Sequence, residues 1–169
     1  GKSAQFPLFT WLPDAMEAPT PVSAYLHAAA MVKAGVYLMA RVIYESGTLP
    51  SWTGGLMAGL ALVTMIVALI FYFYQDDLKR FLAFSTIAQL GYIMLGLSLL
   101  MMGSRTGFRA GVFHIACHAP AKALLFLCVG VLAMRLGVKS ISGISGLSRT
   151  MPVVSVCFFV GLLAVTGIP

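Results

Sequence analysis

Five long apolar runs, each close to the length of a membrane span, constrain this chain more than any other feature of its sequence. A helix needs roughly 20 apolar residues to cross the hydrocarbon core of a bilayer, which is about 30 Å thick. Short polar segments separate the runs, as is typical of antiparallel neighbours in a helix bundle. We therefore expect a single all-α domain over residues 1–169, a polytopic transmembrane helix bundle with spans at about 24–44, 55–74, 81–102, 110–134 and 152–168.

Composition excludes the common soluble classes. The chain is 60% hydrophobic and 9% charged, whereas soluble domains contain about 25% charged residues. Its net charge of +6 comes from lysines and arginines that stand singly or in pairs, so no basic stripe of the kind that binds nucleic acid is present. Short basic loops instead orient a membrane protein. The larger group, which we expect on the cytoplasmic side, is Lys79, Arg80, Arg135, Lys139 and Arg149, against Arg41, Arg105 and Arg109 on the other side.

Both ends of the chain carry helix-breaking residues. Four prolines interrupt residues 1–23, and because proline lacks an N–H and clashes with the preceding turn, this stretch cannot be one straight spanning helix. We expect either a re-entrant, broken helix or an interfacial loop there, since non-helical backbone at membrane depth must be shielded by protein or line a wet cavity. Gly167 and Pro169 would interrupt the last span in the same way. We interpret the chain as the middle of a longer protein.

Ionisable side chains inside the apolar runs are the strongest functional signal. Lys33 and Lys122 each lie in the middle of a run, and His27, His114 and His118 also lie within runs. Placing such a charge at the bilayer centre costs about 2.5–3.5 kcal/mol on insertion scales, so these residues are expected to be functional. A structural tie to a carboxylate elsewhere remains the alternative for Lys33.

Three of these residues are predicted to share one helix face. His114, His118 and Lys122 follow one another at intervals of four residues, a spacing that places side chains one above the other. Histidine changes charge near neutral pH, so such a stripe can pass protons along bridging waters. The alternatives are groups that satisfy a neighbour's backbone or bind a lipid headgroup. Two histidines without a third ligand do not form a metal site, and His27 and Lys33 are expected on different faces.

No motif for hydrolytic or redox chemistry is visible. The sequence has no GxSxG elbow and no phosphate-cradling glycine loop. Cys117, Cys128 and Cys157 lie in apolar runs without the spacing of a zinc or cluster site, and we interpret them as small buried hydrophobic residues. We expect no catalytic residue, metal or cofactor site in this chain.

Several segments closely resemble, in order, the signature blocks of the antiporter-like membrane subunits found in respiratory complex I (chains 5, 4 and 2), Mrp-type antiporters and group 4 membrane-bound hydrogenases. The blocks are GKSAQFPLFTWLPDAMEAPTPVSAYLHAAAMVKAGVYLMAR (1–41), DDLKRFLAFSTIAQLGYIMLGLSL (76–99), FHIACHAPAKALLFL (113–127), GLSRTMPV (146–153) and the terminal TGIP. The sequence of residues 14–37 most resembles that of component D of hydrogenase-4 complexes. Pro120 and Ala121 replace an aromatic pair that is more common in complex I chains.

The resemblance implies a fold and a set of roles. The fold would be part of a bundle of about fourteen helices with two inverted repeats, running from the first broken helix to the start of the second. Lys2 would then be the lysine of the first broken helix, and His27 the bridging histidine on the next helix. His114, His118 and Lys122 would connect the two half-channels.

The resemblance also implies a function. It predicts a proton-translocating subunit of a redox-driven complex in the inner (plasma) membrane, of the membrane-bound hydrogenase or NADH:quinone oxidoreductase type. Iron–sulfur clusters, a nickel–iron site or flavin would belong to partner subunits, so this chain would be a non-redox part of an oxidoreductase. A stand-alone or Mrp-type Na⁺/H⁺ antiporter subunit is the main alternative, and a structural membrane anchor is a third.

Overall fold

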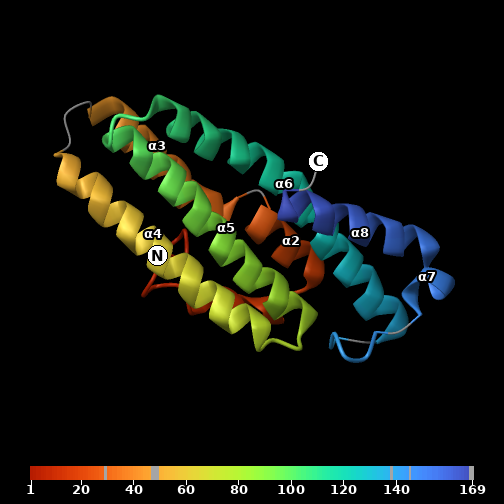
Figure 1. Cartoon of the computed structure of the whole chain (residues 1–169). Coiled ribbons are helices and arrows are strands. Elements are labelled where there is room, and N and C mark those ends of the chain that lie inside the picture. The colour runs from red at the N-terminus through yellow and green to blue at the C-terminus, as the bar shows by residue number, and fades with distance from the viewer. Residues whose placement is uncertain (29, 47–49, 138, 145, 168–169) are drawn as a thin grey trace.

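The computed structural model describes residues 1–28, 30–46, 50–137, 139–144 and 146–167, and in that part of the chain the secondary structure is helical apart from one isolated bridge between Asp77 and Ser140. Helix α5 packs against α3, α4 and α6, while α2 and α8 pack on α6 (Figure 1). The elements are α1 (Trp11–Asp14), η1 (Ala15–Glu17), α2 (Thr20–Ala28), α3 (Met31–Ser46), α4 (Ser51–Phe73), α5 (Leu78–Met101), α6 (Arg105–Leu136), α7 (Leu147–Thr150) and α8 (Pro152–Thr166).

Four segments of the described chain are long and apolar enough to cross a membrane: Thr20–Ser46, Trp52–Phe73, Leu78–Met101 and Arg105–Leu136. They correspond to the first four predicted spans, although their ends differ by a few residues. The fifth, α8, has 15 residues and ends at Gly167, whose φ of 80° places it in the left-handed region. It is therefore shorter than a full span within the described residues, and the predicted end at residue 168 lies outside them.

The first predicted span, 24–44, is divided in the structure. Helix α2 ends at Ala28 and α3 begins at Met31. The amide of Ala30 donates to Tyr25 O, five residues back, at 3.2 Å, so the turn there is wider than an α-helical turn. Lys33 Nζ donates to Ala28 O and gives the C-terminal end of α2 a charged donor. A discontinuity in a spanning segment therefore lies here.

Residues 1–19 contain only short helices. Ser3 Oγ donates to Val32 O at 2.9 Å on α3, and the amide of Phe6 donates to Thr64 Oγ1 at 2.9 Å on α4. Leu12 and Met16 are buried. This segment therefore packs along the bundle and does not form a straight span.

Caps outside the apolar runs set the starts of α5 and α6. The Asp77 carboxylate accepts from the amides of Lys79 at 2.8 Å and Arg80 at 3.0 Å, and Ser104 Oγ accepts from the amide of Gly107 at 3.2 Å. The two helices therefore begin three and five residues before the predicted spans at 81 and 110.

Helices α5 and α6 approach each other closely at two glycines. A Cβ on Gly96 would lie 2.9 Å from Gly111 Cα, a distance that real Cβ atoms essentially never show. Small residues at such a crossing let two backbones pack tightly in a membrane. The polar and ionisable side chains farther along both helices are held close together as a result.

Candidate functional site

Four ionisable side chains of the helices are buried. The exposed fraction is 0% for Lys122 and His27, 3% for His118 and 7% for Lys33. They come from α2, α3 and α6, so residues distant in sequence contribute to the same interior. We call these four residues, together with the half-buried His114, the buried cationic cluster.

Lys122 points from α6 toward α5. Its Nζ donates to Leu82 O at 3.3 Å and to Ser85 Oγ. Both acceptors are uncharged, and no described carboxylate forms an ion pair with Lys122. The amine is thus held by hydrogen bonds alone, an arrangement that leaves it free to be charged or neutral.

His27 of α2 lies beside the aromatic ring of Phe126 on α6. Its ring centroid is 4.9 Å from that of Phe126, and Lys122 is close enough for its charge to act on the imidazole. Within the described residues, neither ring nitrogen has a hydrogen-bond partner, although both are buried. Buried polar atoms of this kind are usually satisfied by ordered water.

His118 is the centre of the cluster. Its ring centroid is 6.0 Å from that of His114, one turn earlier on α6. Lys122, Lys33, His114 and His27 all exert an electrostatic influence on it. Among the described residues its two buried ring nitrogens, like those of His27, have no hydrogen-bond partner.

His114 connects the cluster to two other helices. Gln89 Oε1 of α5 accepts a hydrogen bond from His114 Nε2 at 2.6 Å, and Gln89 Nε2 donates to Val165 O of α8 at 3.3 Å. The Tyr92 ring stands edge-on to the imidazole, with centroids 5.1 Å apart. Gln89 therefore fixes which nitrogen of neutral His114 carries the proton, and it ties the histidine stripe to the C-terminal end of α8.

Lys33 joins the helix discontinuity to α6. Besides Ala28 O, its Nζ donates to Ile115 O at 3.3 Å. His27 and Lys33 were expected on different faces, and the described residues show no contact between them. Both nevertheless lie close enough to His118 for a charge on either to act on its imidazole.

Lys2 is not part of the cluster in this structure. It is exposed, in the turn that precedes Ser3, which binds α3 at Val32. The structure thus brings together five of the six predicted site residues, and the roles of all six stay predictions.

The sequence patterns did not predict Ser85 and Gln89 as site residues. Each is an uncharged polar residue inside an apolar span, and that is the signal by which they could have been found. Both come from α5 and provide hydrogen-bond partners to α6. Helix α5 therefore supplies polar side chains that face His114 and Lys122 of α6.

The described residues contain no group of three or more His, Cys, Asp or Glu side chains that could hold a metal. The expectation of three buried cysteines is wrong for Cys117, which is exposed, while Cys128 is buried and Cys157 intermediate. The amines and imidazoles of the buried cationic cluster can accept and release protons.

The comparisons with known proteins agree with this architecture. The family described as "NADH:quinone oxidoreductase/Mrp antiporter, TM" matches residues 1–169. The chain is 45% identical over 185 residues to NAD(P)H-quinone oxidoreductase subunit 5, chloroplastic, of Anthoceros angustus, covering 99% of this chain and 23% of that protein. It is also 45% identical over 176 residues to F(420)H(2) dehydrogenase subunit L of Methanosarcina mazei, covering 99% and 25%.

Two solved structures share the fold. One is the membrane-bound sulfane sulfur reductase, an archaeal respiratory membrane complex, with a TM-score of 0.88 and 37% identity over 98% of this chain and 34% of that one. The other is the Mrp complex from Dietzia sp. DQ12-45-1b, with a TM-score of 0.88 and 30% identity over 99% and 31%.

The chain spans about a quarter of the length of the curated relatives it matches. The predicted all-α transmembrane bundle and the predicted antiporter-like resemblance are both confirmed. The chain is a multi-pass membrane segment, and it belongs to the NADH:quinone oxidoreductase/Mrp antiporter transmembrane family.

Proposed function

We propose that the protein containing this chain is a proton-translocating membrane subunit of a redox-driven complex, and that the buried cationic cluster carries the protons. The observation that carries this proposal is the burial of two lysines, Lys33 and Lys122, and two histidines, His27 and His118, within the spanning segments. The hydrogen-bond partners of both lysines are uncharged. Such residues are costly in a membrane and typically mark ion pathways.

The cluster offers a sequence of proton carriers. A neutral imidazole can accept a proton on one nitrogen and release one from the other, so His118 and His27 can pass protons that Lys33 and Lys122 hold. Because charges repel strongly in a low-dielectric interior, a proton that arrives on one lysine favours proton loss from its neighbours. Proton movement along the cluster is coupled in this way without a carboxylate.

Lys2 extends the proposal toward the N-terminal side. By resemblance to the family it is the lysine of the first broken helix, and a proton would pass from it through His27 to the stripe on α6. The Ser3 hydroxyl anchors this turn on α3 one residue before Lys33, which places the Lys2 backbone near the discontinuity between α2 and α3.

The redox chemistry would reside on partner subunits, which would hold the clusters, flavin or nickel–iron site. The names of the relatives support this, since they include a quinone oxidoreductase subunit, a dehydrogenase subunit and a respiratory complex. We further propose hydrogenase-type partners in the plasma membrane. That finer assignment rests on the motif in residues 14–37, since none of the relatives named above is a hydrogenase.

An Mrp-type Na⁺/H⁺ antiporter subunit is the second candidate, and the match to the Dietzia Mrp complex favours it. The peripheral subunits that copurify with the full-length protein separate the two. Redox subunits support the first proposal, whereas antiporter subunits alone support the second.

The test of proton transfer uses the full complex in sealed vesicles. Lys122→Met removes the fully buried amine and should abolish acidification of the vesicle interior while the complex still assembles. The matched control is Lys139→Met, at an exposed lysine in the loop after α6, which should translocate at the wild-type rate. Wild-type translocation by Lys122→Met would contradict the proposal.

A further inference from the structure

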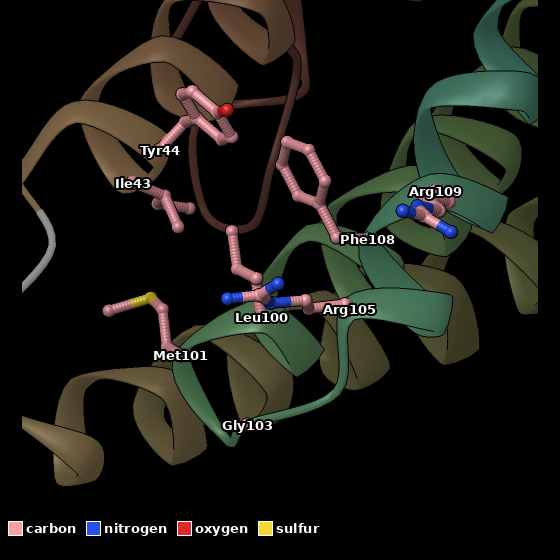
Figure 2. A pocket seen from close by; sticks show the side chains of 8 residues that line it. All are labelled: Ile43, Tyr44, Leu100, Met101, Gly103, Arg105, Phe108 and Arg109. Carbon is pink, nitrogen blue, oxygen red and sulfur yellow. The ribbon is translucent and has the colours of Figure 1, made fainter.

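A pocket of about 620 Å³ opens between the C-terminal ends of α3 and α5 and the N-terminal start of α6. This volume lies within the range of small-ligand sites, about 300–1,000 Å³. Figure 2 shows Arg105 and Arg109 on the first turns of α6, with Phe108 between them, and Tyr44 facing this group from α3. The pocket shares no residue with the buried cationic cluster and plays no part in the proposed proton path.

The pocket carries positive charge without compensation. Arg105 and Arg109 are four residues apart, so their side chains leave the same face of α6. No acidic side chain lines the pocket, and among the described residues neither arginine forms an ion pair. The nearby Glu45 is already paired with Arg41 at 2.5 Å. The lining therefore complements an anion.

The remaining walls are apolar or aromatic. Ile43, Leu100 and Met101 form the side toward α3 and α5. The rings of Tyr44 and Phe108 stack with centroids 6.2 Å apart. A ligand that fits must combine an anionic head with a hydrocarbon part.

The position of the pocket across the membrane also suits such a ligand. It lies where two spanning helices end or begin, at Met101 and Arg105. Tyr44 and Trp52 are 70% and 66% exposed at this end of the bundle. Exposed Tyr and Trp side chains mark the membrane–water interface, the level of the lipid phosphates.

We propose that this pocket binds an anionic phospholipid, with its phosphodiester at Arg105, its acyl chain along Ile43, Leu100 and Met101, and the charge of Arg109 adding to the attraction at the rim. An arginine guanidinium hydrogen-bonds two phosphate oxygens at once, so it suits a phosphodiester group. The proposal stands apart from proton translocation, since it uses none of the same residues.

Native mass spectrometry of the full-length protein, titrated with phosphatidylglycerol or phosphatidylcholine, tests the proposal. We expect tighter binding of phosphatidylglycerol, and an affinity loss of about thirtyfold in Arg105→Gln/Arg109→Gln, as two basic contacts would give. Arg105→Lys/Arg109→Lys should retain most of the preference. The control Arg135→Gln/Arg149→Gln removes the same charge from exposed sites outside the described pockets and should bind like wild type.

Three outcomes would overturn the proposal. The first is equal binding of the two lipids by the wild type. The second is unchanged phosphatidylglycerol binding by the double glutamine variant. The third is displacement of the lipid by inorganic phosphate at equal concentration, which would identify a free-anion site. An unchanged unfolding temperature of the double glutamine variant establishes that a loss of binding is local.

Discussion

Ser85→Ala tests the environment of Lys122 without removing the lysine. Ser85 Oγ accepts a hydrogen bond from Lys122 Nζ, and the other acceptor of that amine is Leu82 O at 3.3 Å. The alanine variant keeps the carbonyl and deletes the hydroxyl, so the change is confined to one side of the amine. Because Ser85 is on α5, the helix that carries Lys122 is not altered.

The expected size of the effect follows from the kind of hydrogen bond. A hydrogen bond to a charged group contributes about 1.5–3 kcal/mol, and about 1.4 kcal/mol corresponds to a tenfold change in an equilibrium constant. The charged state of Lys122 would be populated about tenfold to a hundredfold less. Since Leu82 O remains as an acceptor, we expect the lower end, a proton-translocation rate about tenfold below wild type.

The assay is redox-driven acidification of sealed vesicles that contain the full complex. Ser98→Ala is the matched control, because Ser98 is a fully buried serine on the same helix that donates to Leu95 O at 2.7 Å. It should translocate at the wild-type rate. If Ser85→Ala did so too, the hydrogen bond to Lys122 would have no part in the limiting step, and our reasoning about this site would be refuted.

Three further predictions concern the neighbouring contacts. Gln89→Leu removes the acceptor of His114 and should slow proton translocation in the vesicle assay, whereas Gln89→Glu, which keeps an oxygen there, should slow it less. Lys33→Met leaves two backbone carbonyls without their charged donor and should lower both the rate and the unfolding temperature in detergent. Gly96→Val must push α5 and α6 apart, since a Cβ there lies 2.9 Å from a neighbouring Cα, and should lower the unfolding free energy by about 1–3 kcal/mol. Gly59→Val, where a Cβ meets nothing within 4 Å, is its control.

Each of these predictions has a contrary result. Equal rates for wild type and Gln89→Leu would mean that the tautomer of His114 is unimportant. An unchanged unfolding temperature for Lys33→Met would show that the helix discontinuity holds without its amine. Equal stability of Gly96→Val and Gly59→Val would contradict the close helix crossing.

The spans were predictable because the length of an apolar run reflects the thickness of the hydrocarbon core that it must cross. Their ends were not, since α5 and α6 begin at caps, Asp77 and Ser104, that lie in polar segments outside the apolar runs. A hydropathy boundary marks where lipid begins, whereas a cap marks where backbone hydrogen bonding begins.

The break between α2 and α3 could not be read from local propensity. The residues around it include alanines and Met31, which favour helix. The donor that accompanies the break, Lys33 Nζ, also reaches Ile115 O on α6, 82 residues away in sequence. Such a contact exists only after the helices have packed.

The candidate site was predictable within one helix and not between helices. The spacing of His114, His118 and Lys122 predicted that they share one face of a helix, and the burial of His118 and Lys122 followed from the apolar run around them. The spacing within α6 carries no information on which residues of other helices face it. Gln89 and Ser85 could therefore be recognised as partners only from the packing of α5 on α6.

The central claim is that protons move between His27, His118 and Lys122, and this requires a hydrogen-bonded connection among them. The most direct measurement is an experimental structure of the full-length complex in a lipid nanodisc, at a resolution that shows ordered water. We predict water within hydrogen-bonding distance of the buried ring nitrogens of both histidines and continuous with Lys122 Nζ. Dry, close-packed aliphatic side chains between these groups would contradict the claim.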